Sequence, residues 1–591
     1  MSVVESLQKS AINSLTALFG QAFTEKDFQV NQTKPEFEGD YTIVLFSLVK
    51  SLKLSPDAIG TQLGDHLIAN NPALFTKYNI IKGFLNLSIA DAYWMEVLGK
   101  NYNDICFGKH AMNGKKVMVE YSSPNTNKPL HLGHLRNNFL GWSVAEIFKA
   151  SGYEVIKSCI VNDRGIHICK SMIAWQLFAN GATPQSTNTK GDHFVGDYYV
   201  KFNDEYKKQV EELIASGKTK DEAEKEAPIM KATQQMLLDW EAGKPDVMEL
   251  WATMNSWVYA GFDTTYKTIG SDFDTTYYES NTYLLGKKIV AEGLQKHVFN
   301  QEEDNSVWID LTADGLDKKI VQRKDGTSVY ITQDIGLAQQ KYEEYNIDRS
   351  IYVIGDEQNY HMKVLKLIAE KLQLPNAENI YHLSYGMVEL PTGKMKSREG
   401  TVVDADDIVE EMEKVAQEKT EELGKVKDFT AEELTTLYHT IGLGALKFFL
   451  LRVDPKKKMI FNPEESIDFH GFTGPFIQFN HARIKSILRK EPVIGNLDLG
   501  IVFLPLEKEL IVALEQYPNV VKQACDEMNP SAIAIYVYNI AKTFSSFYTE
   551  HSIANAETDN KKQLRLQLAS MTANVIKSGM SLLGVAVPER M

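Results

Sequence analysis

The stretch VMVEYSSPNTNKPLHLGHLR, residues 117–136, decides the fold. Its first five residues are apolar apart from Glu120 and predict a buried strand, and large apolar side chains recur at helical spacing from Leu135 onward. The motif HLGH (residues 131–134) therefore lies at a strand-to-helix junction. The first turn of a helix leaves backbone N–H groups free and is the positive end of the dipole, which suits a polyphosphate. Gly133 lacks a Cβ, so a nucleotide can approach the backbone there.

A second motif, GKMKSR (residues 393–398), lies far along the chain and combines Lys394 and Lys396 with nearby glycines. Such charges can stabilise the pentacovalent phosphate that forms when an acid attacks ATP, by about 3–4 kcal/mol for one well-placed donor. Two alternatives stay open: HLGH is a chance match whose histidine caps a helix, and GKMKSR is a solvated basic loop. Taken together, the two motifs predict one ATP-handling site.

The length of 591 residues predicts three to five domains. Hydrophobic residues make up 43% and charged residues 24%, which is typical of a soluble globular protein. No apolar run reaches the roughly 18 residues of a membrane helix, and the N-terminal residues lack the basic start and apolar core of a secretion signal. We therefore expect a cytoplasmic protein that does not enter membranes.

The four cysteines, Cys106, Cys159, Cys169 and Cys525, show no CxxC spacing, and only His167 lies close to one of them. They predict no tightly bound metal and fit a reducing compartment. The net charge of −15 argues against a protein that coats nucleic acid without specificity, although a basic stripe on one face would suffice for binding RNA.

Four regions are predicted along the chain. Residues 1–110 alternate helical stretches, such as 3–19 and 56–69, with strand-like runs, such as 84–89. Residues 111–405 contain the strand candidates VMVEY, EVIKSCIV, SVYITQD and SIYVIGDEQ separated by helices, the order of a parallel sheet with crossover helices, which a helical insertion interrupts at about 186–300. Residues 406–470 form a helical connection, and residues 471–591 form a helix bundle.

HLGH and GKMKSR resemble the HIGH and KMSKS motifs of class I aminoacyl-tRNA synthetases, and the residues around them resemble the arginyl-tRNA synthetases. Residues 37–60 are similar to the N-terminal additional domain of that family, which contacts the tRNA elbow. The last region, including the closing PERM, is similar to its anticodon-binding domain. The resemblance implies a multidomain α/β protein: a Rossmann-like catalytic domain with a helical insertion, an N-terminal α+β domain and a C-terminal all-α bundle.

The resemblance also implies an arginine–tRNA ligase, which forms arginyl-adenylate and pyrophosphate and then transfers arginine to the terminal adenosine of tRNA(Arg). Positioning and charge stabilisation account for most of such catalysis, so no side-chain nucleophile is required. The implied partners are tRNA(Arg), L-arginine and ATP, with Mg²⁺ accompanying ATP rather than lying in a protein cage. A monomer is the usual state of the family.

The residues that would handle ATP are those in and around the two motifs. The resemblance implies catalytic roles for His131, His134, Lys394, Lys128 and Lys396, and ATP contacts for Leu132, Gly133, Asn125, His361, Met387 and Lys394. The match departs from the family pattern at Ser397, where KMSKS has its second lysine, and at Lys396, where it has serine. Lys128, upstream of HLGH, can compensate, so the division of roles among the three lysines stays open.

A pocket for arginine needs carboxylates for the planar guanidinium and gains from an aromatic face. The resemblance implies that Glu120, Tyr330 and Asp334 bind the side chain and that Asn125 and Gln358 hold the α-amino end. Two alternatives compete: Glu120 is an edge-strand charge, and Asp334 is the N-cap of a helix over residues 335–345.

Anticodon contacts are implied in the last region. The candidates that could stack on or bond to splayed bases are Phe476, Phe479, His481, Arg483 and Met591. The alternative for both phenylalanines is a place in a helical core.

Three other functions compete with this interpretation. A cysteine-specific class I synthetase would carry zinc-ligand cysteines, and a small adenylyltransferase with an HxGH motif would lack the KMSKS-like loop and the long helical C-terminal region. An inactive tRNA-binding paralogue would have lost His131, His134 or Lys394, and all three are present.

Overall fold

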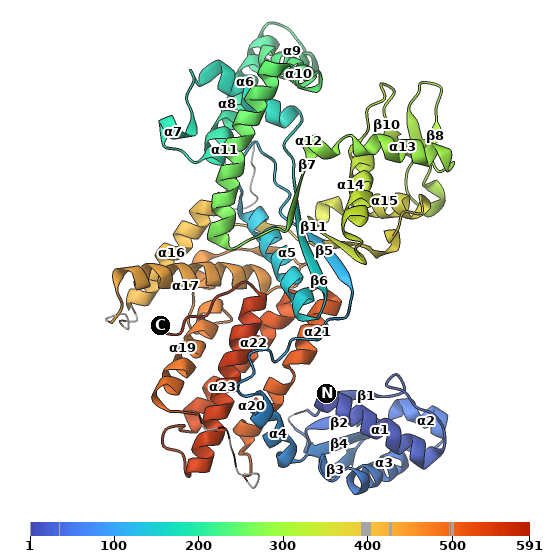
Figure 1. Ribbon diagram of the computed structural model, residues 1–591, viewed down its shortest axis with the longest axis vertical. Coiled ribbons are helices and arrows are strands. Elements are labelled where there is room, and N and C mark those ends of the chain that lie inside the picture. Colours follow the sequence, from blue (N-terminus) through green and yellow to red (C-terminus); the bar gives the residue numbers. More distant parts are fainter. Residues whose placement is uncertain are drawn as a thin grey trace.

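The computed structural model describes residues 2–34, 36–391, 403–422, 424, 428–493, 495, 497 and 501–591. A parallel sheet lies at the centre, with the insertion helices α6–α11 at one end and the C-terminal bundle with the N-terminal domain at the other (Figure 1). A second, smaller unit around α13–α15 lies to one side of the sheet. The expected fold class, with its three kinds of domain, is confirmed.

The N-terminal domain is a four-stranded antiparallel sheet in the order β1-β2-β4-β3 with helices packed against it. Its first helix begins after Ser2, whose side chain forms a capping box with Glu5. The helices predicted over residues 3–19 and 56–69 and the strand over 84–89 are confirmed. The elements are α1 (Val3–Phe19), β1 (Gln29–Gln32), β2 (Tyr41–Val44), α2 (Phe46–Leu52), α3 (Pro56–Asn70), β3 (Phe75–Ile81), β4 (Phe84–Ile89) and α4 (Asp91–Asn101).

The central sheet has the order β12-β11-β5-β6-β7, and all its pairs are parallel. From β5 the chain crosses through α5 to β6 and β7 on one side and returns later to β11 on the other side. The order therefore reverses between β5 and β11, and ligands of such sheets bind at the carboxyl ends of the strands there. The elements are β5 (Lys116–Glu120), α5 (Leu132–Ala150), β6 (Glu154–Val161), β7 (Thr275–Tyr278), β11 (Arg349–Gly355) and β12 (Ile380–Tyr385).

The helical insertion lies earlier in the chain than predicted, with helices that run from Ile166 to Ile269 instead of from about 186 to 300. Residues 275–278 form β7, which pairs with β6, so the expected end of the insertion near residue 300 is wrong. Its last long helix already ends at Ile269, where Gly270 adopts the left-handed conformation that ends helices. The helices between β6 and β7 are α6 (Ile166–Phe178), α7 (Pro184–Thr187), α8 (Gly191–Ala215), α9 (Lys220–Glu226), α10 (Pro228–Glu241) and α11 (Pro245–Ile269).

The stretch SVYITQD, predicted as a strand, instead begins a helix. Helix α14 starts at Tyr330, and its buried residues Ile331 and Ile335 are four positions apart, as on one helical face. The short β-branched run had hidden this period. The elements of this smaller unit are α12 (Glu279–Thr282), α13 (Leu285–Gln295), β8 (Asn300–Gln301), β9 (Val307–Ile309), β10 (Lys319–Gln322), α14 (Tyr330–Tyr345) and α15 (Asn359–Lys371).

The C-terminal third is helical, as predicted. Among the helices that the structure describes, α17 is the one that is long and apolar enough to cross a membrane, and 67% of its most apolar window is buried, as in a core helix. The elements are β13 (Val388–Glu389), α16 (Ala405–Glu422), α17 (Ala431–Leu451), β14 (Met459–Ile460), α18 (Pro463–Ser466), α19 (Gly474–Lys490), α20 (Pro505–Glu515), α21 (Tyr517–Glu527), α22 (Pro530–Glu550) and α23 (Asp559–Leu582).

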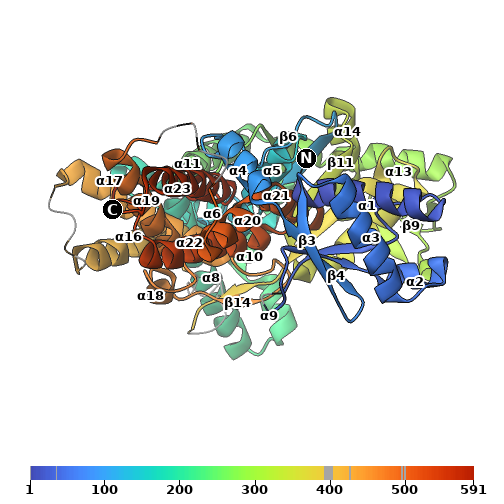
Figure 2. The same ribbon diagram turned by 90° about the horizontal axis from the view of Figure 1, so that it is seen from below.

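The N-terminal domain is attached to this bundle. The Val3 N–H, in the first turn of α1, donates to the buried Glu515 carboxylate at 2.7 Å, and Lys508 lies 3.1 Å from Asp40. Figure 2 shows α1 and β3 beside α20 and α21. The N-terminal domain and the C-terminal bundle therefore pack against each other, although they lie at opposite ends of the sequence.

Candidate active site

The HLGH motif joins β5 to α5 and forms its own cap. His131 is the N-cap residue, and its Nδ1 accepts a hydrogen bond from the Gly133 N–H at 3.1 Å. The Nδ1 of His134 accepts one from the His131 N–H at 3.1 Å, and the two ring centroids lie 3.9 Å apart. The predicted junction is confirmed, and the capping role offered as the alternative also holds for His131.

The backbone of the first turn does not offer free donors. The Leu132 N–H donates to the Val403 carbonyl, the Gly133 N–H to the His131 ring, and the His134 N–H to the His131 carbonyl. The expectation that these groups bind phosphate is therefore wrong. A Cβ on Gly133 would lie 3.0 Å from the His131 ring, so this glycine makes room for the imidazole.

The two histidines are neutral donors. Because each Nδ1 accepts a hydrogen bond, the pattern assigns the ring proton to Nε2. Burial, reinforced by the charge of Lys128, lowers the pKa of His131 to about 3, and burial with the His131 and Lys128 charges holds the pKa of His134 well below its usual value. At neutral pH the motif therefore presents two Nε2–H groups at the positive end of α5.

The chain that follows GKMKSR lies directly on HLGH. Two backbone hydrogen bonds, from Leu132 to Val403 at 3.2 Å and from Ala405 to Leu130 at 3.0 Å, pair the segments in antiparallel fashion. The two motifs, about 260 residues apart, are thus brought together through residues 403–405. GKMKSR itself lies outside the described residues.

The chain that precedes GKMKSR is also attached to α5. The Arg136 Nη2 donates to the carbonyls of Pro455 at 3.1 Å and Lys457 at 2.8 Å, just before β14, which pairs with β13. A Cβ on Gly386, just before β13, would lie 2.7 Å from the Lys457 backbone. Described residues on both sides of 392–402, the range that contains Lys394 and Lys396, are therefore attached to the HLGH helix directly or through residues 455–460.

Two of the predicted arginine ligands, Tyr330 and Asp334, lie on α14, at the carboxyl end of the sheet. The Asp334 carboxylate lies 2.7 Å from the His361 Nε2, and Tyr330 at the start of α14 is 69% exposed. The alternative role of Asp334 as an N-cap is wrong, because Val329 is the N-cap and Asp334 is the fifth residue of the helix. The Asp334 side chain is instead 40% exposed and contacts His361.

The remaining predicted contacts lie at the carboxyl ends of neighbouring strands of the central sheet. Asn125 and Gln358 are exposed beyond the ends of β5 and β11, and Asn125 forms a bridge with Asn162 after β6. Met387 is half-buried beside Gly355, at the end of β11. Asn125, Gln358 and Met387 thus come from three segments, which follow β5, β11 and β12 at the point where the strand order reverses.

Glu120 is neither an exposed ligand nor an edge charge. It ends the central strand β5, is 6% exposed, and pairs with the fully buried ammonium group of Lys341 on α14. The Lys341 Nζ also lies 4.7 Å from the centre of the Tyr352 ring. Glu120 therefore fixes α14, the helix that carries Tyr330 and Asp334.

Replacing Glu120→Gln is expected to lower the free energy of unfolding by about 1–3 kcal/mol, because the Lys341 charge would lose its carboxylate in the interior. Thermal melts measure the change. Glu154→Gln is the matched control, since its pair with Lys116 is exposed and should contribute about 1 kcal/mol or less. A Glu120→Gln protein that melts like the wild type but binds arginine weakly would instead show direct contact with substrate.

Glu279 is a carboxylate that the sequence analysis did not select. It follows β7 directly and is half-buried. Burial raises its pKa to about 7, Arg164 opposes the shift, and the charges of Asp163 and Asp334 add to it. The negative charge of Asp334 thus acts on Glu279, as the smallest of these four effects. Its position at the carboxyl end of a strand was the available signal.

One group of possible metal ligands occurs among the described residues. Asp192, His193 and Asp406 bring ligand atoms within 4.8 Å of one another. The Lys190 Nζ lies 3.1 Å from Asp192 and 2.6 Å from Asp406, so an ammonium group already neutralises these carboxylates. The cluster is therefore an ion-pair network rather than a metal centre.

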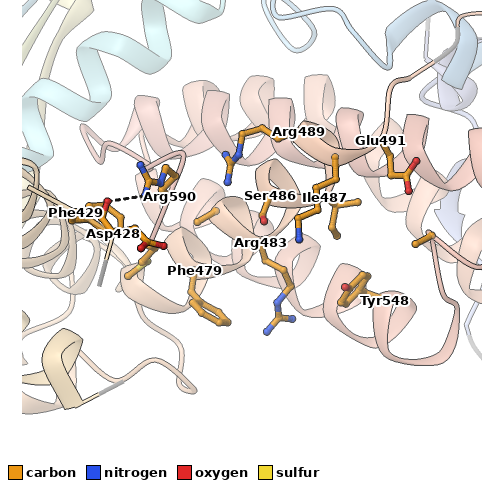
Figure 3. A pocket seen from close by; sticks show the side chains of 14 residues that line it. Asp428, Phe429, Phe479, Arg483, Ser486, Ile487, Arg489, Glu491, Tyr548 and Arg590 are labelled. Carbon is orange, nitrogen blue, oxygen red and sulfur yellow. Dashed lines mark hydrogen bonds between the residues drawn. The ribbon is translucent and has the colours of Figure 1, made fainter. Parts of the chain in front are cut away.

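A second site lies in the C-terminal bundle, where a cavity of about 570 Å³ opens between α19, the end of α22 and the C-terminus. Figure 3 shows Arg483 extending between the rings of Phe479 and Tyr548, and the guanidinium carbon lies 4.8 Å and 5.9 Å from the two ring centres. Met591 and Arg590 also line this cavity.

Two predicted anticodon contacts lie elsewhere. His481 is 1% exposed, and its Nδ1 donates to the Pro588 carbonyl at 3.0 Å, so it anchors the PERM segment and cannot reach a base. Phe476 packs against Tyr538, with ring centres 5.4 Å apart, in agreement with the core alternative. Phe479, Arg483 and Met591 remain as candidates.

Family models match nearly the whole chain. The model described as tRNA synthetases class I (R), catalytic domain, matches residues 98–462, and those described as Arginyl tRNA synthetase N terminal domain and DALR anticodon binding domain match residues 5–89 and 477–591. The parallel sheet with HLGH at its reversal point is thus the catalytic domain of a class I aminoacyl-tRNA synthetase.

Known proteins define the class further. The chain is 52% identical over 604 residues to the arginine–tRNA ligase of Flavobacterium psychrophilum and 52% identical over 598 residues to that of Bacteroides thetaiotaomicron, each with 100% of both chains covered. The arginyl-tRNA synthetase structure of Thermus thermophilus matches with a TM-score of 0.79 at 23% identity, over 99% of this chain and 100% of that one. The chain belongs to the arginyl-tRNA synthetase family, and it activates arginine with ATP and charges tRNA(Arg).

Proposed function

We propose that ATP lies across the N-terminus of α5 with its phosphates on the Nε2–H groups of His131 and His134. The observation that carries this proposal is the pair of buried rings whose Nδ1 atoms are both engaged by backbone N–H groups. Neutral donors fixed in this way stabilise developing negative charge without reorganisation. Leu132 and Gly133 shape the site, while Asn125, Met387 and His361 border the nucleotide.

The positive charge for the transferred phosphate comes from lysines. Lys128 precedes the motif, and its charge already acts on both histidines. We infer that Lys394 and Lys396 add further charge, because the described residues on either side of them in the sequence are attached to α5 and its neighbours. Mg²⁺ enters bound to ATP, because it retains several waters and needs few protein ligands.

Arginine lies between α14 and the end of β7. Asp334 and Glu279 face the guanidinium, Tyr330 covers it, and Asn125 and Gln358 hold the α-amino end. This orientation directs the carboxylate of arginine toward the α-phosphate over HLGH. Attack forms arginyl-adenylate and releases pyrophosphate, and the terminal adenosine hydroxyl of tRNA(Arg) then takes the arginyl group. Positioning and charge stabilisation supply the catalysis.

The cavity on α19 receives an anticodon base, with Phe479, Arg483 and Met591 as its contacts. A base can stack on an aromatic ring or on a guanidinium plane, and Arg483 already lies over Phe479. The N-terminal domain, which lies beside the bundle, contacts the tRNA elbow. We propose a monomeric cytoplasmic enzyme with units at about 1–110, 111–405, 406–470 and 471–591.

Arg483→Ala is expected to raise the KM for tRNA(Arg) about 5- to 100-fold, because one stacked base is worth about 1–3 kcal/mol by alanine substitution. Aminoacylation at varied tRNA concentration measures the effect, and the KM for arginine should stay unchanged. Lys542→Ala is the control, since Lys542 is an exposed cation on α22 that is not among the residues lining this cavity. Equal effects of the two variants would indicate general attraction of RNA instead.

Amino-acid-dependent ATP–pyrophosphate exchange with all twenty amino acids, with and without tRNA, tests the site as a whole. Exchange should appear with arginine alone among them. Exchange with cysteine would favour the sister synthetase, and adenylylation of a small acceptor without tRNA transfer would favour the adenylyltransferase. Binding of tRNA without any exchange would favour an inactive paralogue.

A further inference from the structure

A charged cluster on the insertion holds the segment that lies on HLGH. The Lys190 Nζ lies 2.6 Å from the Asp406 Oδ2, and the His193 Nε2 lies 3.2 Å from the same atom and 3.3 Å from the Asp404 Oδ2. Thr265 on α11 donates to the Asp406 Oδ1 at 2.9 Å. We call Lys190, His193 and Thr265 the clamp, since together they contact the carboxylates of Asp404 and Asp406.

The two insertion helices are built to reach this point together. A Cβ on Gly191 would lie 2.0 Å from the Trp257 carbonyl oxygen, and one on Gly261 would lie 2.3 Å from the Asp192 carboxylate. These glycines allow α8 and α11 to approach closely enough for both to touch Asp406. Hydrogen bonds to Asp404 and Asp406 raise the pKa of His193 to about 10, so it is cationic at neutral pH.

The held segment is continuous with the catalytic motif. Asp404 forms a backbone bridge with His131, and the Ala405 N–H donates to the Leu130 carbonyl at 3.0 Å. Leu132, whose N–H donates to Val403, is the first residue of α5. A displacement of residues 403–406 would therefore move the HLGH backbone and, with it, the Nε2 of His131.

We propose that Lys190 and His193 are positioning residues for arginine activation, acting through Asp404 and Asp406 to hold the HLGH histidines against ATP. The helical insertion thereby takes part in the chemistry through the segment 404–406 that it contacts. The inference rests on the proposed contact between HLGH and the phosphates.

The test is arginine-dependent ATP–pyrophosphate exchange with His193→Ala and, as an independent second variant, Lys190→Met. Each is expected to lower kcat about 10- to 100-fold, because small misplacements of reacting groups cost this much, while the KM for arginine changes less than about twofold. The matched control is His439→Ala. It removes a contact of 2.6 Å between the His439 Nδ1 and the carboxylate of Glu413, which lies on α16, the helix that also carries Asp406. Its kcat should equal that of the wild type.

A conservative variant separates positioning from general stability. His193→Gln keeps a donor near Asp404 and Asp406 and should recover most of the lost kcat, and all the variants should melt within a few degrees of His439→Ala. A kcat for His193→Ala equal to that of His439→Ala, or a loss of kcat in both that follows their melting temperatures, would overturn the inference. His131→Asn is measured in parallel: if it is fully active, the proposed role of HLGH has failed rather than the clamp.

Discussion

His134→Asn is expected to slow arginine activation by about 10²–10³-fold, the cost of removing one preorganised donor from a developing negative charge. The asparagine Oδ1 takes the position of the imidazole Nδ1, so the acceptor for the His131 N–H is kept. The Nε2–H donor is lost. Pyrophosphate exchange measures the change, and the protein should stay folded, because the hydrogen bond accepted from the His131 N–H is retained.

The titration of the two rings gives an independent check. Their pKa values in the folded protein lie below that of an exposed histidine, so the unfolded chain binds more protons below about pH 6.5. The free energy of unfolding should therefore decrease as the pH is lowered below about 6.5, by up to about 1.4 kcal/mol per pH unit for each ring. His134→Asn should flatten this slope between pH 6.5 and 4.5, and exchange should show no inflection from these rings. An unchanged slope in the variant would contradict the buried neutral ring.

The parts of the fold that could be predicted are those that depend on local sequence patterns, such as hydrophobic periodicity and helix caps. The strand VMVEY, the helix after HLGH and the helix over residues 3–19 each carry a clear period or a cap. The prediction of a strand for SVYITQD was wrong because a stretch of seven residues, three of them β-branched, fits a strand as well as the first turns of a helix. Its identity depends on packing of Ile331 and Ile335 against neighbours that the sequence does not specify.

The candidate site shows the same division. The sequence correctly places HLGH at a strand-to-helix junction, but it cannot show that the first-turn N–H groups are already used, since one of them binds a segment about 270 residues away. Glu120 is an odd charge in an apolar strand, and only the partner Lys341 explains it. Glu279 follows β7, which has only four residues and therefore gives a weak signal in the sequence. Long-range pairing, rather than composition, decides these three roles.

Asp334→Asn and Glu279→Gln are each expected to raise the KM for arginine about 10- to 100-fold, because a hydrogen bond to a charged group contributes about 1.5–3 kcal/mol. The double variant should raise the KM for arginine about 10³-fold. The KM for ATP should stay within a few-fold of that of the wild type. Asp317→Asn is the control, since this exposed carboxylate accepts from Tyr360 outside the pocket at 2.9 Å. Pyrophosphate exchange at varied arginine concentration measures all four proteins.

Citrulline makes this test specific for charge, since its neutral urea has nearly the shape of the guanidinium. In the wild type, the two carboxylates should strengthen the binding of arginine but not that of citrulline. A neutral ligand does not offset the repulsion between the charges of Glu279 and Asp334. Each neutralising variant should therefore lower the preference for arginine over citrulline by about the factor that it adds to the arginine KM. A raised arginine KM with an unchanged preference would mean that the carboxylates shape the pocket and that another group recognises the guanidinium.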